Sequence, residues 1–413
     1  MLEILGIKAK EASKFLMTVS QTQKNNALSQ IAKGLMRDMD KILLANNQDI
    51  ENGKKNELSE ALLDRLKLDE KRVAGIAAGI EELIKIPDPV GVVENEFTRP
   101  NGLHIKKVSV PIGVIGIIYE ARPNVTADAA AICLKAGNAV ILRGGKEAIH
   151  SNITIADSMR KSLELAGFPE DCIGLVTDTS RDSANAMMKL NRYLDLLIPR
   201  GGAGLIQAVV QNSTVPVIET GTGNCHIYVD AAAELDMAAN IVFNAKTSRP
   251  SVCNAAESLL VHKSVAKAFL PKVKRLLDTR QVEMRGCERT RQILGDNIVA
   301  ATEEDYAREF LDFIISVKVV DTLDEAIALI SKYSTGHSDC IVTTDKRAAE
   351  EFTARVDSAA VYVNASTRFT DGGEFGFGAE IGISTQKLHA RGPMGVKELT
   401  SYKYLVLGEG QIR

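Results

Sequence analysis

One cysteine in this chain has a setting that suits nucleophilic chemistry. Among the six cysteines, Cys253 follows a proline-containing loop, Thr247-Ser-Arg-Pro-Ser-Val-Cys253, and the next residues, Asn-Ala-Ala-Glu, favour a helix. A helix N-terminus stabilises a thiolate, which is the reactive form of the side chain. The alternative for any cysteine is simple packing in the core, which we expect for Cys133, Cys172 and Cys340.

Two turns combine glycines with cations. Arg143-Gly-Gly-Lys146 follows the apolar run Ala139–Leu142, and its glycines and charges suit a phosphate; a solvated turn is the alternative. Arg200-Gly-Gly-Ala-Gly204 follows Leu196–Pro199 and is similar to a dinucleotide-binding turn. It does not fit G-x-G-x-x-G, so a tight strand-to-helix turn remains the alternative for Gly201 and Gly202.

Two further polar clusters follow predicted strands. Glu219-Thr220-Gly221-Thr-Gly223 comes after Val215–Ile218, where Glu219 suits a base or an acceptor for backbone N–H groups. Asn364, Ser366 and Arg368 come after the strand-like run Ala359–Val363. Their amide, hydroxyl and guanidinium groups suit an anionic, amino-acid-like ligand, and an arginine-stabilised loop is the alternative.

Alternating strands and helices must position these residues. Continuous apolar runs separated by helical patterns begin near Pro111, and a second such cycle begins near Ile241. Such a pattern predicts parallel sheets covered on both faces, with ligands at the carboxyl ends of the strands. The first 86 residues are helical in pattern, with Asp69 expected to cap one helix and Ser151 a later one.

A hairpin is predicted between these blocks. Val90–Thr98 and Leu103–Val110 flank Arg99-Pro-Asn-Gly102, and Asn-Gly between strand-like runs is a strong hairpin signal. The alternation slips at Lys106–Lys107, which predicts a bulge. Its exposed edges need a partner, either another subunit near the C-terminal strand Thr400–Leu407 or the hairpin's own domain.

Composition excludes several classes of protein. The 413 residues are 45% hydrophobic and 25% charged, with a net charge of −3, which argues against nucleic-acid binding and a basic membrane surface. No signal peptide or apolar run of about 20 residues is present, so we expect a cytoplasmic protein. The scattered cysteines and histidines predict neither disulfides nor a metal site.

Several strings resemble the gamma-glutamyl phosphate reductase family of the aldehyde dehydrogenase superfamily. They run in order from about residue 10 to the end and include Tyr-Glu-Ala-Arg-Pro-Asn-Val-Thr (119–126), Ile-Leu-Arg-Gly-Gly-Lys-Glu (141–147), Glu-Thr-Gly-Thr-Gly-Asn-Cys-His (219–226), Arg-Pro-Ser-Val-Cys-Asn-Ala (249–255) and Val-Asn-Ala-Ser-Thr-Arg-Phe-Thr-Asp-Gly-Gly (363–373). The resemblance implies reduction of L-glutamyl 5-phosphate by NADPH to glutamate 5-semialdehyde, a step of proline biosynthesis, through a thioester on the cysteine.

The resemblance also implies an α/β, aldehyde dehydrogenase-like fold with two doubly wound domains and a projecting β-hairpin for oligomerisation. The NADP-binding domain would comprise 1–89 and 111–243 with part of 380–397, and the catalytic domain 244–379. The hairpin 90–110 and the segment 398–413 would join subunits into a dimer or tetramer, and an association with the kinase that makes the substrate is compatible with this.

Individual roles follow from the same resemblance. Cys253 would be the nucleophile, with the Asn124 side chain and the Cys253 N–H binding the oxyanion, and Glu219 matches the base of hydrolytic members. Lys146 stands where NAD-dependent members carry a glutamate, which favours NADP, and Glu309 matches a nicotinamide-ribose contact. The remaining expected contacts are Arg143, Gly201, Gly202, Thr220 and Gly221 for the cofactor and Arg122, Asn364, Ser366 and Arg368 for the substrate.

Two other functions agree less well with these residues. A CoA-acylating relative would use the same thioester, but the polar 364–368 loop suits a small charged amino acid better than an acyl chain. A catalytically silent scaffold would not need Cys253, Asn124 and the glycine turns together.

Overall fold

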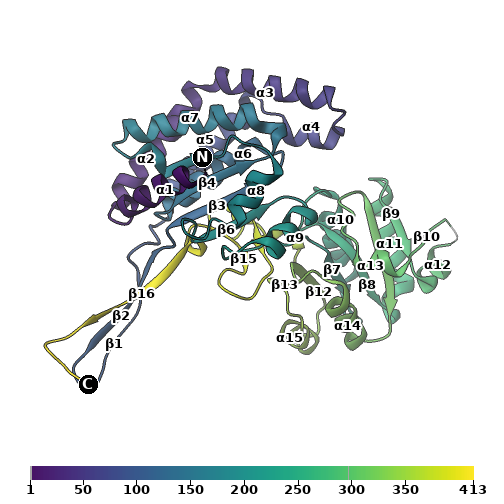
Figure 1. The fold of residues 1–413 in the computed structure, drawn as a ribbon. Coiled ribbons are helices and arrows are strands. Elements are labelled where there is room, and N and C mark those ends of the chain that lie inside the picture. Colours follow the sequence, from purple (N-terminus) through teal and green to yellow (C-terminus); the bar gives the residue numbers. More distant parts are fainter. Residues whose placement is uncertain (1, 296) are drawn as a thin grey trace. The chain divides into compact units, whose positions relative to one another are not determined.

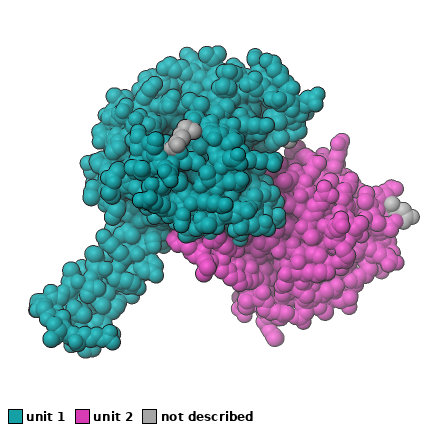
Figure 2. Space-filling model, in the orientation of Figure 1, with its two compact units in different colours: residues 1–220, 376–382, 393–413 teal, residues 221–375, 383–392 magenta. Residues whose placement is uncertain are grey.

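The computed structural model describes residues 2–295 and 297–413, which form two compact units (Figure 2). Unit 1 comprises residues 1–220, 376–382 and 393–413, and unit 2 comprises 221–375 and 383–392. No helix of the described chain is long and apolar enough to cross a membrane.

Unit 1 contains a four-stranded parallel sheet in the order β5-β4-β3-β6 (Figure 1). Its strands are β3 (Val114–Tyr119), β4 (Ala139–Gly144), β5 (Ile173–Leu175) and β6 (Leu196–Arg200). All six residues of β3 are buried, as the unbroken apolar run predicted. The expected strand at Val215–Ile218 is reduced to a bridge between Val217 and Leu197, because Pro216 has no N–H to donate to a ladder.

Helices cover this sheet. They are α1 (Leu2–Leu16), α2 (Gln21–Arg37), α3 (Met39–Lys55), α4 (Glu60–Leu66), α5 (Glu70–Lys85), α6 (Pro123–Lys135), α7 (Ile149–Leu165), α8 (Arg181–Met188) and α9 (Ala203–Asn212), with short 3-10 turns at η1 (Lys146–Ala148), η2 (Glu170–Cys172) and η4 (Lys397–Leu399). Asp69 caps α5 as predicted, by accepting from the Arg72 N–H at 2.8 Å. The prediction for Ser151 was wrong, because Ser151 lies inside α7. Its N–H and hydroxyl both donate to the buried carboxylate of Asp49 in α3.

Unit 2 is built on a seven-stranded parallel sheet in the order β10-β9-β11-β8-β7-β12-β13. Its strands are β7 (Cys225–Val229), β8 (Ala256–His262), β9 (Glu283–Gly286), β10 (Val299–Ala300), β11 (Ile314–Val320), β12 (Ser338–Val342) and β13 (Ala360–Val363); β14 (Ile383–Ser384) and β15 (Gly392–Pro393) form a separate two-stranded sheet. Residues 221–243 were expected in the first domain, but β7 pairs with both β8 and β12, which places them in unit 2.

The helices of unit 2 pack on both faces of its sheet. They are α10 (Leu235–Thr247), α11 (Lys263–Asp278), α12 (Glu288–Leu294), α13 (Glu303–Ala307), α14 (Leu323–Tyr333), α15 (Lys346–Arg355) and the 3-10 turn η3 (Thr367–Phe369). One buried cluster joins α10 and α11 to the sheet, and a second joins α14 and α15 to it. The doubly wound arrangement predicted for this part of the chain is therefore present.

The predicted hairpin is formed by β1 (Val93–Thr98) and β2 (His104–Pro111), which pair antiparallel and extend away from the rest of unit 1 (Figure 1). The bulge lies on β1, between Val93 and Asn95, rather than at Lys106–Lys107 on β2. The chain's own β16 (Thr400–Leu407) pairs with β2 along its whole length. The second edge of β2 is thus covered within the chain, and the role of this ribbon in oligomerisation stays a prediction.

Candidate active site

The carboxyl edge of the unit 1 sheet gathers most of the residues expected to bind the cofactor. The last residue of β3, Tyr119, pairs with Gly144 of β4 and Arg200 of β6. The segments that follow these three strands, 120–124, 145–146 and 201–202, therefore begin side by side. A ligand site at the carboxyl ends of parallel strands is what the sequence pattern predicted.

Arg143 is held rigidly at this edge. Its Nη2 donates to the carbonyls of Thr179 and Ser180 at 2.7 and 2.8 Å, and burial lowers the pKa of its guanidinium. Its Nε is buried and has no hydrogen-bond partner within the described residues. Lys146 begins the following 3-10 turn and is exposed. One cation held by hydrogen bonds and one exposed cation at a strand end suit a phosphate group.

Gly201 and Gly202, the N-cap residue, directly precede α9 and lie against a carboxylate that the sequence analysis did not single out. The Gly202 N–H donates to Glu120 Oε2 at 2.8 Å, and a Cβ on Gly201 would lie 2.6 Å from the same oxygen. Glu120 follows β3 directly, so its place at this strand edge was the available signal. A helix N-terminus favours an anionic group, and the Glu120 carboxylate is the anion that contacts it here.

Asn124 lies in the first turn of α6, where Arg122 is the N-cap residue. The Asn124 side-chain amide donates from Nδ2 to Asp128 Oδ2 at 2.9 Å. Burial raises the pKa of Asp128 to about 6, against the opposing effects of the Asn124 hydrogen bond and the charge of Arg200. Asp128 was missed, although its spacing four residues after Asn124 on a predicted helix pointed to this contact.

Residues 219–221 lie where unit 1 meets unit 2 in the sequence. Thr220 is buried and donates its hydroxyl to the Pro199 carbonyl at 2.9 Å, which ties it to the end of β6. Glu219 is half-buried in unit 1. Gly221 belongs to unit 2, where its N–H donates to the Ile383 carbonyl and a Cβ would lie 2.4 Å from Thr385.

Cys253 lies in a turn at the amino edge of the unit 2 sheet. The expectation that a helix follows it was wrong: Ala256 begins β8, which is buried between β7 and β11. Strand pairing outweighs the weak helical preference of Asn-Ala-Ala-Glu, because the next residues are an apolar run that fills the sheet. Cys253 is half-buried, whereas Cys133, Cys172, Cys225 and Cys340 are buried.

Two backbone contacts fix the position of Cys253. The buried thiol of Cys225 donates to the Cys253 carbonyl at 3.2 Å. The Cα of Gly223 lies so close that a Cβ there would be 1.5 Å from the same oxygen. Glu309 in turn accepts from the Gly223 N–H at 2.7 Å, and burial raises the pKa of its carboxyl. Glu309 therefore binds the segment just before β7, and this segment contacts the Cys253 carbonyl.

Arg368 ties the η3 turn to the Cys253 turn. Its Nε donates to Ser248 Oγ at 3.0 Å and its Nη1 donates to Asn254 Oδ1. Asn254 is further bound by Thr367, whose hydroxyl donates to the Asn254 carbonyl at 2.7 Å. Ser366 caps this turn by accepting from the Arg368 N–H. Ser366 and Arg368 thus lie beside the turn that contains Cys253.

Asn364 does not join them. It follows the carboxyl end of β13, whereas Cys253 precedes the amino end of β8 in the same parallel sheet. Both polar atoms of its side chain are bound by the Thr343 backbone, each at 2.9 Å. The chain reverses at Asn364, which has a positive φ of 56°, and so returns residues 366–370 toward the opposite edge.

A buried ion pair close in sequence to Cys253 was also missed. Lys246 Nζ and Glu257 Oε2 are 2.6 Å apart, and neither side chain is exposed. Burial raises the pKa of Glu257 to about 7 and lowers the pKa of Lys246, while each charge favours the other. The two residues lie on either side of residues 247–256 in the sequence, so their ion pair holds the two ends of this segment together.

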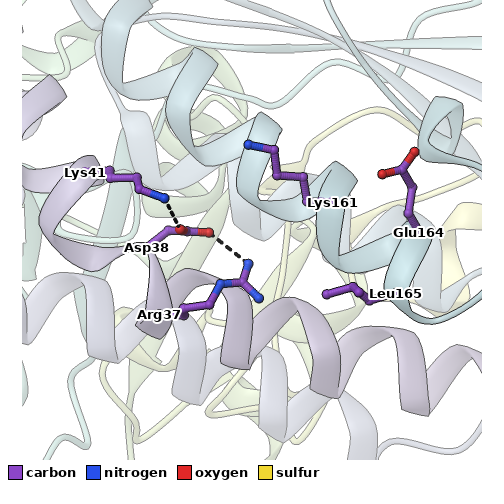
Figure 3. A pocket seen from close by; sticks show the side chains of 6 residues that line it. All are labelled: Arg37, Asp38, Lys41, Lys161, Glu164 and Leu165. Atoms are coloured by element: carbon purple, nitrogen blue, oxygen red, sulfur yellow. Dashed lines mark hydrogen bonds and ion pairs between the residues drawn. The ribbon is translucent and has the colours of Figure 1, made fainter.

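A charged groove on unit 1 is a weaker candidate for a functional site. A groove of about 470 Å³ on unit 1 is lined by Arg37, Asp38, Lys41, Lys161, Glu164 and Leu165 (Figure 3). Arg37 and Lys41 both bind Asp38 there, so each of these cations is already paired with a carboxylate. Among residues 2–295 and 297–413, no three His, Cys, Asp or Glu side chains are grouped as metal ligands would be.

Comparison with known proteins identifies the relatives of this chain. The profile of the aldehyde dehydrogenase family matches residues 6–293 and 301–404. Gamma-glutamyl phosphate reductase of Heliobacterium modesticaldum is 60% identical over 412 residues, covering 100% of this chain and 99% of that protein. The enzyme of the same name from Clostridium perfringens is 60% identical over 410 residues, covering 99% of each.

Solved structures agree with these relatives. The crystal structure of gamma-glutamyl phosphate reductase from Thermotoga maritima has a TM-score of 0.98 at 50% identity, covering 100% of this chain and 99% of that one. An acetylating aldehyde dehydrogenase from Geobacillus thermoglucosidasius has a TM-score of 0.71 at 18% identity, covering 100% and 97%. The second likeness supports the fold alone.

Proposed function

Because the chain belongs to the aldehyde dehydrogenase family, we propose that it reduces L-glutamyl 5-phosphate to L-glutamate 5-semialdehyde with NADPH and releases phosphate. The substrate is supported by the names of relatives that are about 60% identical over the whole chain. This reaction is a step of proline biosynthesis.

The observation that carries the chemistry is the setting of Cys253. It is half-buried, its carbonyl is fixed by Cys225 and contacts Gly223, and its turn is bound to Arg368 through Ser248 and Asn254. A reachable thiol in a rigid turn beside a guanidinium suits a nucleophile that attacks an anionic substrate.

The first chemical step would use Cys253 alone as nucleophile. Its thiolate attacks the acyl carbon, a carbon–sulfur bond forms, and the bond to the phosphate oxygen breaks. Phosphate leaves with the bonding electron pair. Charge develops on the carbonyl oxygen, and the Asn124 amide and the Cys253 N–H would donate to it. Loss of one such donor typically lowers the rate by about 10²–10³.

The residues at the carboxyl edge of the unit 1 sheet fit NADPH. Arg143, with its buried and unpartnered Nε, and exposed Lys146 would bind phosphate groups. Gly201 and Gly202 would contact the cofactor at the N-terminus of α9, where the Gly202 N–H donates to Glu120 in this structure. Thr220, whose hydroxyl donates to Pro199 at the end of β6, and Gly221 are the other candidate cofactor contacts. Bound NADPH would supply the hydride that reduces the thioester. Cys253 then leaves as the thiolate and frees the aldehyde.

Glu309 and Glu219 would have different roles in this reaction. Glu309 is placed as a candidate cofactor contact by its match to the family, and in this structure it binds the Gly223 N–H. Glu219 matches the base of hydrolytic members, yet the proposed reaction has no water to activate. Arg122 and Asn364 stay candidate substrate contacts, although the Asn364 side chain is already bound to Thr343.

The proposal also includes the oligomeric state and the cellular location of the protein. We propose a cytoplasmic homo-oligomer that pairs through the ribbon of β1, β2 and β16, whose outer strands carry exposed apolar residues such as Phe97 and Tyr404. An exposed, partly apolar strand edge favours a protein partner.

The reverse reaction tests the proposal. Purified protein is mixed with glutamate 5-semialdehyde, phosphate and NADP⁺, and NADPH formation is followed by its absorbance. We expect NADPH formation that requires phosphate and is lost in Cys253→Ala. Turnover without phosphate, or turnover that requires CoA in its place, would contradict the acyl-phosphate reaction.

A further inference from the structure

Two arginines come together beside the Cys253 turn. Arg368 bridges that turn, since its Nε donates to Ser248 Oγ at 3.0 Å and its Nη1 donates to Asn254 Oδ1. Arg249 directly follows Ser248, so its backbone is one residue away from the group that holds the Arg368 guanidinium. Residues 249–253 therefore lie, in the sequence, between the two residues that the Arg368 side chain binds.

Neither arginine forms an ion pair with a carboxylate of the described residues. Arg249 is exposed and forms no ion pair with any described residue. The Nη2 of Arg368 likewise makes no hydrogen bond within the described chain. The charge of Asp371 favours the Arg368 cation, but the Asp371 carboxylate also accepts from the backbone N–H groups of Gly373 and Glu374.

Electrostatic effects on Arg368 agree with this geometry. Burial lowers the pKa of the Arg368 guanidinium, and the charge of Arg249 lowers it further. Asp371 and Cys253 act in the opposite direction, because a negative charge favours the charged guanidinium. Two like charges this close repel one another, and an anion that binds both relieves the repulsion.

We propose that Arg249 and Arg368 together bind the phosphate group of the substrate beside Cys253, an inference that rests on the proposed function. Each guanidinium offers a pair of parallel N–H donors that match phosphate oxygens. No helix N-terminus follows Cys253, so this arginine pair also supplies the positive charge that favours its thiolate.

The position of the pair distinguishes phosphate from the other anion of the substrate. In L-glutamyl 5-phosphate the phosphate oxygen is bonded to the carbon that the thiolate attacks, whereas the α-carboxylate lies at the far end of the side chain. Cations next to Cys253 therefore meet the phosphate. They neutralise the charge that phosphate gains when it leaves with the bonding electrons.

Arg249→Gln tests the inference, because an exposed side chain without an ion pair can be changed without disturbing the fold. In the reverse reaction we expect the KM for phosphate to rise about tenfold or more, as loss of a charge-assisted contact implies. The KM values for semialdehyde and NADP⁺ should stay near those of the wild type, and Arg249→Lys should restore part of the phosphate affinity.

A matched control is Arg347→Gln. Arg347 is also exposed, but it follows the carboxyl end of β12, at the opposite edge of the sheet from Cys253. This variant should keep the wild-type KM for phosphate. An unchanged KM for phosphate in Arg249→Gln, or a rise confined to the semialdehyde, would overturn the inference while leaving the proposed function intact.

A second measurement does not depend on turnover. Inorganic phosphate, compared with chloride at equal ionic strength, should slow alkylation of Cys253 by iodoacetamide in the wild type and in Arg347→Gln but not in Arg249→Gln. Equal protection in all three proteins would refute the arginine pair as the phosphate site. A wild type without phosphate-dependent turnover would instead refute the proposed function, and the alkylation result would still decide the anion site.

Discussion

Gly223 and Cys253 are in backbone contact: a Cβ on Gly223 would lie 1.5 Å from the Cys253 carbonyl oxygen and 2.5 Å from its Cα. No side-chain movement relieves such an overlap, because the obstructing atoms are backbone. We predict that Gly223→Ala displaces the Cys253 turn and lowers kcat/KM by at least about 10²-fold, since small misplacements of reacting groups have effects of this size.

Gly79→Ala is the control for this substitution. Gly79 lies within α5 and nothing stands within 4 Å of a Cβ placed on it. Alanine is favoured over glycine inside a helix by roughly 1 kcal/mol, so this variant should be active and at least as stable as the wild type. Wild-type kcat/KM in Gly223→Ala would show that the Cys253 turn tolerates the displacement.

Alkylation of the native protein should be selective for Cys253. Burial raises the pKa of the thiols of Cys172 and Cys340 to about 12, and it also raises those of Cys133 and Cys225. These four should resist iodoacetamide until the protein unfolds, as measured by peptide mass spectrometry. Half-buried Cys287 is the comparison, and Cys287→Ala should keep full activity. Faster labelling of a buried cysteine than of Cys253 would contradict this prediction.

The buried pair of Lys246 and Glu257 should matter for stability. Lys246→Met leaves the Glu257 carboxylate without a cation in a site that has no solvent exposure, which typically costs about 3–5 kcal/mol. Lys246→Met with Glu257→Gln should recover much of this loss. The neutral amide needs no counter-ion, and its oxygen can still accept from the Leu311 N–H, as Glu257 does at 3.1 Å.

Chemical unfolding of the single and double variants measures this effect. The partly exposed pair of Lys274 and Asp278, also 2.6 Å apart, gives the comparison. Lys274→Met should cost no more than about 1 kcal/mol, as expected for a surface pair. Equal losses for Lys246→Met and Lys274→Met would mean that burial does not decide the energy of the Lys246–Glu257 pair.

Lys146→Glu should change the preference for the cofactor. A carboxylate at this exposed position repels the 2′-phosphate of NADPH, whereas NADH has no such group. We expect the KM for NADPH to rise about tenfold or more and the KM for NADH to change little. Lys161→Glu makes the same charge change on α7, in a groove whose other cations bind Asp38, and should leave both values unaltered. An unchanged ratio in Lys146→Glu would exclude this lysine from cofactor choice.

Local pattern predicted much of the fold but less of the site. The strand at Thr400–Leu407 has the predicted bounds, and the turns after β3, β4 and β6 meet at one sheet edge as expected. Continuous apolar runs specify such elements without reference to distant residues.

Contacts between distant residues explain what the pattern missed. Arg368 binds Ser248, which is 120 residues earlier, and no periodicity encodes that pairing. Cys253 precedes a strand because β8 is needed between β7 and β11, although its immediate neighbours favour a helix. Asn364 and Arg368 are close in sequence, yet the reversal at Asn364 sends them toward opposite edges of the sheet.

Asp128 should make stability depend on pH. Burial raises the pKa of its carboxyl to about 6, although the Asn124 N–H and the charge of Arg200 favour the ionised form. With a raised pKa, the folded protein holds this proton at a pH where the unfolded chain has already lost it. The contribution of Asp128 therefore favours folding at about pH 4 and declines as the pH rises through about 6, by roughly 2–3 kcal/mol in all.

Asp128→Asn removes this titration while leaving an oxygen that can accept from Asn124. The unfolding free energy of the variant minus that of the wild type should therefore increase by roughly 2–3 kcal/mol between about pH 4 and pH 7. Urea unfolding followed by circular dichroism measures the difference. Asp157→Asn is the control, because Asp157 is exposed on α7 and forms no ion pair within the described residues, so its difference should be flat. A flat difference for Asp128→Asn as well would mean that the Asp128 carboxyl titrates alike in the folded and unfolded chains.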